Sequence, residues 1–117
     1  MAKFLLSAFA DEASGSIDGQ IRALKRNGIK FMEARIVEGK SIIDRDAASI
    51  KNMKKMLDHS GIAVSSIGSP IGKISAGDPF GPHIESFKRT LETARILGSK
   101  NIRIFSFYIP PDKSAAD

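Results

Sequence analysis

The 117-residue chain has no cysteine, which excludes disulfide bonds, thiolate nucleophiles and cysteine-based zinc sites and allows a reducing compartment. Histidine is scarce as well, because only His59 and His83 are present. Neither stands at the end of a predicted strand, and we expect both on the surface, so no histidine-based metal site is predicted. Carboxylates near strand ends could supply one ligand, but a full set of hard-metal ligands is not visible.

Long apolar runs are also missing. The longest one near the start covers residues 4–10, which is too short for a membrane-spanning helix and lacks the features of a signal peptide. We therefore predict a strand there, in a cytoplasmic protein that has no membrane partner.

The chain carries 18 lysine and arginine residues against 13 aspartate and glutamate residues, a formal net charge of +5. A basic surface attracts nucleic acids or anionic metabolites. Much of the excess, however, recurs at helical spacing opposite an apolar stripe, which is typical of a solvated helix face. The charged positions are Lys51, Lys54, Lys55 and Asp58, and the apolar ones are Ile50, Met53 and Leu57.

Apolar periodicity predicts strands and helices in alternation along the chain. We expect strands at residues 3–9, 29–35, 62–67 and 101–108, and helices at residues 17–27, 45–59 and 82–97. Ser16 and Asp44 are expected to cap the first two helices. The third helix is expected to bury one apolar face, made of Ile84, Phe87, Leu91, Ala94 and Leu97. Such alternation implies right-handed crossovers and a parallel sheet with helices on its outside.

Residues 1–117 are thus predicted to form a single α/β domain of parallel (β/α) barrel type, with four strands and three helices. A complete eight-stranded barrel takes about 250 residues, so these elements correspond to an N-terminal half of a TIM barrel. Such a piece leaves its first and last strands as unpaired edges and one sheet face bare. Residues 109–117 resemble the loop after the fourth strand, so we expect either a truncation or the pairing of two copies.

In parallel barrels, function collects at the carboxyl ends of the strands and in the loops that follow. Met32 and Ala34 share the apolar side of the second strand, which fits the helix layer. Glu33 and Arg35 therefore point into the barrel interior, and the same alternation turns Arg103 inward. Inward charges must pair with one another or reach water and substrate. Glu33 could thus pair with Arg103 or contact a polar substrate.

The loop after the third strand, Gly68-Ser69-Pro70-Ile71-Gly72-Lys73, combines two glycines, a hydroxyl group and a cation. Glycines let backbone N–H groups approach a ligand, and Lys73 could meet an anion. The loop lacks the Walker spacing, so a phosphate cradle competes with a plain turn that needs these backbone angles. Ser69 in this loop and Ser106 at the end of the fourth strand are further candidates for substrate contact.

Three blocks stand in order along the chain: residues 28–35 with Glu38-Gly39-Lys40, residues 66–73, and Ile102-Arg103-Ile104-Phe105-Ser106-Phe107. Together they resemble the sugar phosphate isomerase/epimerase family, a group of xylose isomerase-like TIM barrels. The resemblance runs from the first predicted strand to the fourth and so covers the N-terminal half of such a barrel.

The resemblance implies a divalent-metal enzyme, using Mn²⁺, Mg²⁺ or Zn²⁺, that interconverts an aldose and a ketose or epimerises a ketose. Two carboxylates would exchange a proton beside the sugar carbonyl while the metal polarises the oxygens. The metal ligands of the family come mostly from strands five to eight. No metal is therefore expected for this chain alone, and its catalytic residues stay unassigned.

The related abasic-site endonucleases draw zinc-binding histidines from early strand ends, where Ser69 and Ser106 stand here, so nucleic acid is not expected as a partner. The resemblance instead implies the substrate-binding half of a sugar isomerase or epimerase, inactive alone. Its ligand would be a sugar or sugar phosphate held by Glu33, Arg35, Ser69, Lys73 and Ser106. The alternative is a non-catalytic half-barrel that self-associates through its open edges or pairs with a separate C-terminal half.

Overall fold

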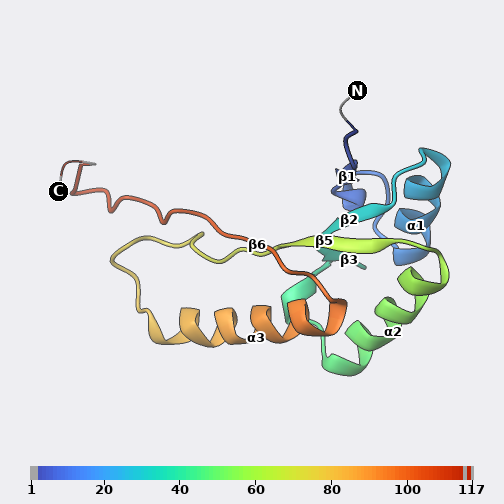
Figure 1. Ribbon diagram of the computed structural model, residues 1–117. Coiled ribbons are helices and arrows are strands. Elements are labelled where there is room, and N and C mark those ends of the chain that lie inside the picture. Colours follow the sequence, from blue (N-terminus) through green and yellow to red (C-terminus); the bar gives the residue numbers. More distant parts are fainter. Residues whose placement is uncertain (1–2, 115, 117) are drawn as a thin grey trace.

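A computed structural model of the chain describes residues 3–114 and residue 116. Four parallel strands form one sheet in the order β1-β2-β5-β6, and helices connect consecutive strands of this sheet (Figure 1). The elements are β1 (Ser7–Ala8), α1 (Ile17–Arg26), β2 (Phe31–Ala34), α2 (Ala47–His59), β5 (Ala63–Gly68), α3 (Gly81–Leu97) and β6 (Ile102–Arg103). The predicted α/β class and the parallel four-stranded sheet with three helices are confirmed.

One face of the sheet is buried against the helices. Met32 and Ala34 of β2 and Ile67 of β5 are almost completely buried and belong to the same hydrophobic core. Glu33 and Arg35, which alternate with them, are only half-buried. The helices contribute Ile21 and Leu24 from α1, Ile50, Met53 and Leu57 from α2, and Ala94 and Leu97 from α3. The predicted alternation along β2 is therefore confirmed, and its charged side chains face away from the helix layer.

The start of α1 and the polar face of α2 agree with the sequence. The side chain of Ser16 accepts a hydrogen bond from a backbone N–H three residues later, at 3.0 Å. On α2, Lys55 is exposed, and Lys54 pairs with Asp58 across one helical turn at 2.8 Å. These lysines form the solvated helix face that their spacing predicts.

The predicted cap of α2 is wrong by two residues. Asp46, rather than Asp44, accepts the hydrogen bond from the N–H of Ser49, at 2.7 Å. Asp44 instead ends a short 3-10 helix, η2 (Ile42–Asp44), which buries its two isoleucines in the core. This turn delays the start of α2 and leaves the Asp44 carboxylate to pair with Arg89 of α3, at 3.3 Å.

The first strand is much shorter than the predicted span of residues 3–9. Its neighbour β2 begins only at Phe31, which pairs with the first residue of β1. Before it, Gly28 adopts a left-handed conformation, with φ of 68°, and turns the chain at the end of α1. Residues 4–6 therefore have no paired strand beside them and are exposed.

The fourth predicted strand is regular only in β6, but its continuation runs beside the loop that follows β5. The N–H of Phe105 donates to the carbonyl of Ile71 at 2.7 Å, and that of Tyr108 donates to Ile74 at 2.8 Å. Gly72 lies between these bonds with φ of 84°, and a Cβ at this position would overlap the carbonyl oxygen of Phe105. Only glycine fits here, because any side chain would push the two segments apart.

A small hairpin that the sequence did not predict follows β2 directly. Its strands are β3 (Ile36–Val37) and β4 (Lys40–Ser41), which pair antiparallel. Glu38 and Gly39 join them with positive φ values of 54° and 72°, the conformation of a two-residue hairpin turn. This hairpin separates β2 from the start of α2.

A bulge interrupts the pairing of β2 with β5. Met32 is paired with Val64, but the next residue, Glu33, is paired with Ser66, so that Ser65 is extra. Val64 and the isoleucine three positions later are consequently both buried in the core.

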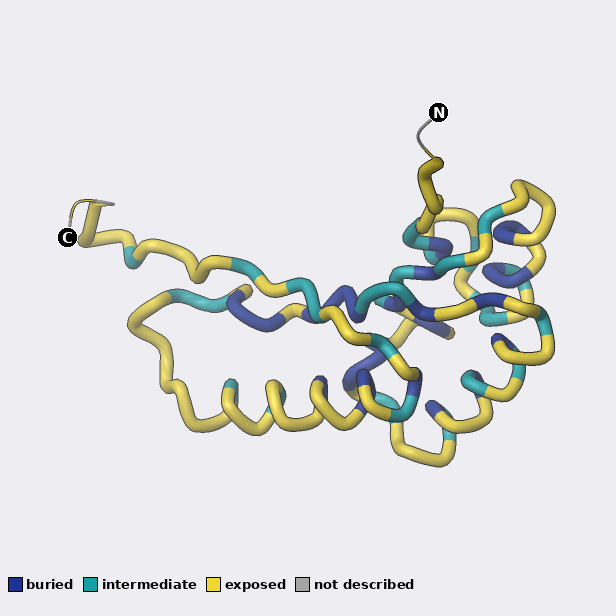
Figure 2. Tube along the Cα trace, in the orientation of Figure 1, coloured by how far each residue is buried: buried dark blue, intermediate teal, exposed yellow. Residues whose placement is uncertain are grey.

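Only the C-terminal part of α3 packs against the core. Ala94 and Leu97 are buried, whereas Ile84, Phe87 and Leu91 are 41%, 39% and 48% exposed (Figure 2). The prediction of one continuous buried face is therefore wrong for these three residues, and the N-terminal half of the helix extends beyond the sheet (Figure 1). The radius of gyration is accordingly 16.0 Å, against roughly 13.5 Å for a globular chain of this length.

Within the described part of the chain, no helix combines the length and apolar character that crossing a membrane requires.

Replacing Gly72 with alanine should lower the free energy of unfolding by about 1–3 kcal/mol or more, because the residue has positive φ and its Cβ would overlap Phe105. Urea unfolding followed by circular dichroism measures this change. Gly77→Ala is the matched control in the same loop, because its Cβ would make only an ordinary contact with Pro110, at 3.9 Å. A control variant as unstable as Gly72→Ala would contradict this explanation.

Candidate functional site

Charged side chains gather where the parallel strands of the sheet end. Arg35 directly follows β2, Lys73 lies in the loop after β5, and Arg103 is the last residue of β6. All three, with the ring of Phe105, line a pocket of about 170 Å³, which we call the carboxyl-end pocket. The carboxyl ends of parallel strands are the usual place for ligands in α/β proteins, so this pocket is the first candidate site.

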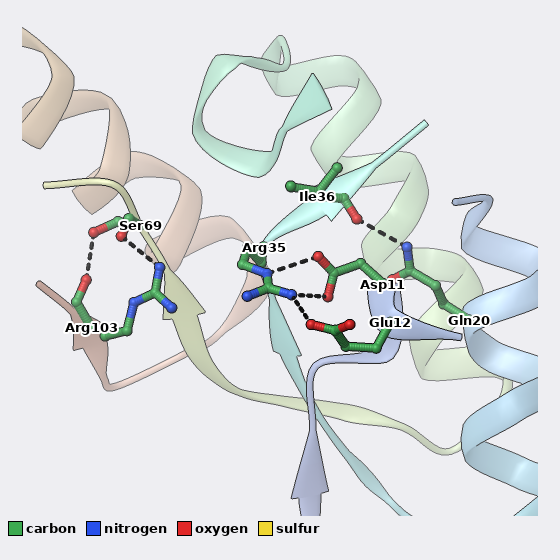
Figure 3. Close-up of polar contacts among 7 residues, drawn as sticks. All are labelled: Asp11, Glu12, Gln20, Arg35, Ile36, Ser69 and Arg103. Carbon is green, nitrogen blue, oxygen red and sulfur yellow. Dashed lines mark hydrogen bonds and ion pairs between the residues drawn. The ribbon is translucent and has the colours of Figure 1, made fainter. Parts of the chain in front are cut away.

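Arg35 is held by two carboxylates from the short 3-10 helix that follows β1, η1 (Ala10–Glu12) (Figure 3). Its Nε and Nη2 donate to the two oxygens of Asp11 at 2.8 and 3.1 Å, and Nη2 also donates to Glu12 at 2.7 Å. These hydrogen bonds, the one to Asp11 first, raise the pKa of Arg35 above its ordinary value. The guanidinium is thus permanently charged and fixed in orientation.

Two phenylalanine rings support the arginines of the pocket. The Cζ atom of Arg35 lies 4.4 Å from the ring centre of Phe9, and that of Arg103 lies 5.5 Å from the same ring. Arg103 also lies 4.6 Å from the ring of Phe105, and the Nζ atom of Lys73 lies 5.5 Å from it. Ring faces attract cations, so the rings stabilise three positive charges in a small volume.

Ser69 and Arg103 lock the end of β5 to β6 with two reciprocal hydrogen bonds (Figure 3). The hydroxyl of Ser69 donates to the carbonyl of Arg103 at 2.5 Å, and Nη2 of Arg103 donates to the carbonyl of Ser69 at 3.0 Å. Ser69 is fully buried. Its hydroxyl is therefore engaged inside the chain and reaches the pocket only through Arg103.

The backbone N–H groups of the loop after β5 are also engaged internally. The N–H of Lys73 donates to Pro70, and those of Ser69 and Ile71 have acceptors within the chain. The N–H of Gly72 donates to Nε2 of His83 at 2.8 Å. This arrangement favours the turn over the phosphate cradle, since the amides of the loop already have acceptors.

His83 is half-buried rather than on the surface as predicted. Besides accepting the hydrogen bond from the loop, its ring lies 6.0 Å from the ring of Phe80 and 5.8 Å from that of Phe107, measured between centres. The imidazole must be unprotonated at Nε2 to accept this bond. His83 therefore anchors the loop after β5 to the start of α3, while His59 is exposed as expected.

Of the other predicted contacts, Glu33 is half-buried on the same side of the sheet as Arg35, two residues before it. Among the described residues its carboxylate has no hydrogen bond or ion pair, so of the two alternatives that the sequence left open, the pair with Arg103 is not formed. Ser106 is exposed and lines a different hollow of about 380 Å³ with Asp78 and Phe107. Arg35 and Lys73 are thus the two predicted residues that share the carboxyl-end pocket.

The predicted substrate contacts did not include the residues that support the charged groups. Asp11 and Glu12 follow the first strand, and their acidic character at a strand end was the signal that they could meet Arg35. Phe105 stands two positions after Arg103, which puts both on one side of the strand. Nothing local in the sequence indicates that Phe9 would contact two arginines.

The described residues do not fit the divalent metal that the resemblance implies. They contain no group of three histidine, aspartate or glutamate side chains close enough to hold an ion. The carboxylates of Asp11 and Glu12 are both bound to Arg35, which lines the pocket.

Two comparisons with known proteins give no relative. No protein-family model matches the chain, and a search of the curated proteins finds no match. The sequence blocks and the geometry of the carboxyl-end pocket are therefore the basis for any statement about function.

Replacing Arg35 with methionine should lower the free energy of unfolding by about 1–3 kcal/mol, because the carboxylate of Asp11 would lose its partner in a mostly buried position. The side chain of Asp11 is 9% exposed. Urea unfolding of the variant measures the loss. Arg95→Met is the matched control, since it removes an arginine whose ion pair with Glu92 is exposed and should leave stability nearly unchanged. Equal losses in the two variants would contradict a structural role for the Arg35 pair.

Proposed function

We propose that the chain is the substrate-binding part of a sugar or sugar phosphate isomerase/epimerase-like barrel and forms the first four strands and three helices of that barrel. The observation that carries the proposal is the gathering of charged side chains at the carboxyl ends of four parallel strands, on the face without helices. Enzymes built as parallel barrels bind substrate at this end. The sequence blocks that resemble the family contain Glu33, Arg35, Lys73 and Arg103.

Each proposed contact has a role that follows from its surroundings. Glu33 is a carboxylate on the open face that has no ion pair among the described residues, and it would accept hydrogen bonds from sugar hydroxyl groups. Arg35 is oriented by its carboxylates and presents a fixed cation, and Lys73 is an exposed cation at the rim. Ser69 acts indirectly by holding Arg103, and Ser106 would meet only a ligand long enough to reach its separate hollow.

The chemistry of the family requires a metal and two carboxylates placed on either side of a sugar carbonyl. Since the described residues do not fit the metal, no catalytic step is assigned to them. We therefore propose that this chain binds the substrate and that it has no turnover alone.

Titration of the chain with a panel of ketoses, followed by amide chemical shifts in two-dimensional NMR, tests substrate binding. We expect shifts near Glu33 and Arg35, and an affinity that is about tenfold weaker in Glu33→Gln, because a charge-assisted hydrogen bond is lost. Glu85→Gln is the control, since Glu85 is an exposed carboxylate on α3 and should leave the affinity unchanged.

Binding of no ketose at this face would contradict the proposed substrate. Isomerisation or epimerisation by the chain, together with stoichiometric Mn²⁺, Mg²⁺ or Zn²⁺ in elemental analysis, would show instead that the chain is active alone.

The sheet itself favours a second candidate, a non-catalytic half-barrel that pairs with a second copy. Its two edges, β1 and β6, run in the same direction, and a two-fold axis parallel to the strands would bring β1 of one copy beside β6 of the other. Closure of both edges in this way would cover the bare face and leave no unpaired strand. Apolar side chains are exposed along both edges: Phe4, Leu5 and Leu6 before β1 and Ile104 after β6 are 84%, 81%, 64% and 59% exposed.

Light scattering after size exclusion should then give a mass of about twice 12.6 kDa. Leu5→Lys should shift the protein to the monomer, because a charge at the edge opposes strand pairing. Leu91→Lys changes an exposed leucine on α3, away from both edges, and should leave the dimer intact. A monomer at every concentration would rule out this second candidate.

A further inference from the structure

Arg103 is a partly buried cation without a carboxylate partner among the described residues. Its Nη2 donates to the carbonyl of Ser69, and its Nε is buried with no hydrogen-bond partner in that part of the chain. Otherwise its charge is offset by the rings of Phe9 and Phe105. Buried charges in proteins are usually paired, because the loss of hydration is costly. An anion from outside the chain would supply the missing partner.

A second unpaired cation lies at the same ring. Lys73 is exposed, has no ion pair among the described residues, and places its Nζ near the ring of Phe105 that Arg103 also contacts. The neighbouring acids do not balance these two charges, because Asp11 and Glu12 are both bound to Arg35. Arg35, Arg103 and Lys73 with these two carboxylates sum to a net charge of +1, and Arg103 and Lys73 are the two cations of the pocket that no carboxylate of the described residues pairs with.

One residue in the wall of the pocket allows its neighbours to pack closely. Gly68 forms part of it, and a Cβ there would come within 2.9 Å of the ring of Phe9 and 3.2 Å of Cβ of Arg35. The missing side chain keeps Phe9 and Arg35 close together at the end of the sheet. The pocket volume of about 170 Å³ suits a small charged group, whereas the rest of a larger ligand would lie over the bare sheet face.

We propose that the carboxyl-end pocket is a binding site for a phosphate monoester group, held between Arg103 and Lys73. Two unpaired cations match a group that carries close to two negative charges at neutral pH. The guanidinium offers donors in a planar fork, and the ammonium adds a point charge at the rim. Side chains would bind this group, since the amides of the loop have internal acceptors. This proposal rests on the proposed function only for the identity of the molecule that carries the phosphate group, which would be a sugar.

The test is an NMR titration of the whole chain with inorganic phosphate at low ionic strength, where charge interactions are least screened. We expect amide shifts at Gly68, Lys73 and Arg103. Lys73→Gln should weaken phosphate binding about tenfold, the loss expected for one charge-assisted hydrogen bond. Arg103→Lys keeps the charge but loses the fork, and should weaken binding by a smaller factor. Lys55→Gln removes an exposed lysine of α2 and should leave the affinity unchanged.

Because Lys73 is exposed, its variant is expected to fold, and circular dichroism checks this for all three variants. The proposal would be overturned by the absence of amide shifts at the pocket, or by a Lys55→Gln variant that weakens phosphate binding as much as Lys73→Gln does. Phosphate would then have no specific binding site in the pocket.

A ketopentose 5-phosphate and the same ketopentose without phosphate separate this site from the proposed function. Tighter binding of the sugar phosphate than of inorganic phosphate, lost in Lys73→Gln, would support both. Equal binding of the two phosphates, with none of the free sugar, would support the anion site and contradict the sugar ligand. Binding of the free sugar without any phosphate binding would overturn the anion site alone.

Discussion

Burial of one sheet face under three helices is the constraint on which the rest of the structure depends. It requires apolar residues at alternate positions of the central strands, as Met32 and Ala34 of β2 demonstrate. The residues between them are released from the core, so charged side chains such as Glu33 and Arg35 can stand on the opposite face. Their charges keep contact with water there, which a fully enclosed position would not allow without a partner. The asymmetry of the sheet thus separates the part that stabilises the fold from the part available to a ligand.

The charged end of the sheet is assembled from segments that are far apart in the sequence. Arg35 draws on η1 for its carboxylates, and Arg103 draws on Ser69 for its hydrogen bonds. Both guanidinium groups lie against Phe9, so one ring joins the first, second and last strands. Stability and the shape of the pocket are therefore coupled, because the contacts that hold the strand ends together also orient the cations.

The sequence predicted features that depend on local periodicity and failed where distant segments decide. Alternation in β2 and the cap at Ser16 are local, and both agree with the structure. Asp44 is a residue type that commonly caps helices. The two isoleucines before it, however, are buried in a 3-10 turn, so α2 begins further along the chain. The bulge at Ser65 had a signal in the uneven spacing of apolar residues along β5, which a regular strand does not explain. The sequence held no signal for the exposed apolar residues of α3, since periodicity indicates that a helix has an apolar face and not whether another element covers that face.

The clamped backbone around Arg35 has a consequence for the entropy of binding. The carbonyl of Arg35 accepts a hydrogen bond from the N–H of Ile42 at 2.8 Å. The buried side chain of Gln20 donates to the carbonyl of Ile36, the residue after Arg35, at 2.9 Å. Arg35 is thus immobilised at both its main chain and its side chain before a ligand arrives. Lys73 is exposed and free to rotate, and fixing it costs up to about 2 kcal/mol of side-chain entropy. The pocket is preorganised on one wall and adaptable on the other, which favours ligands that differ in shape beyond a shared charged end.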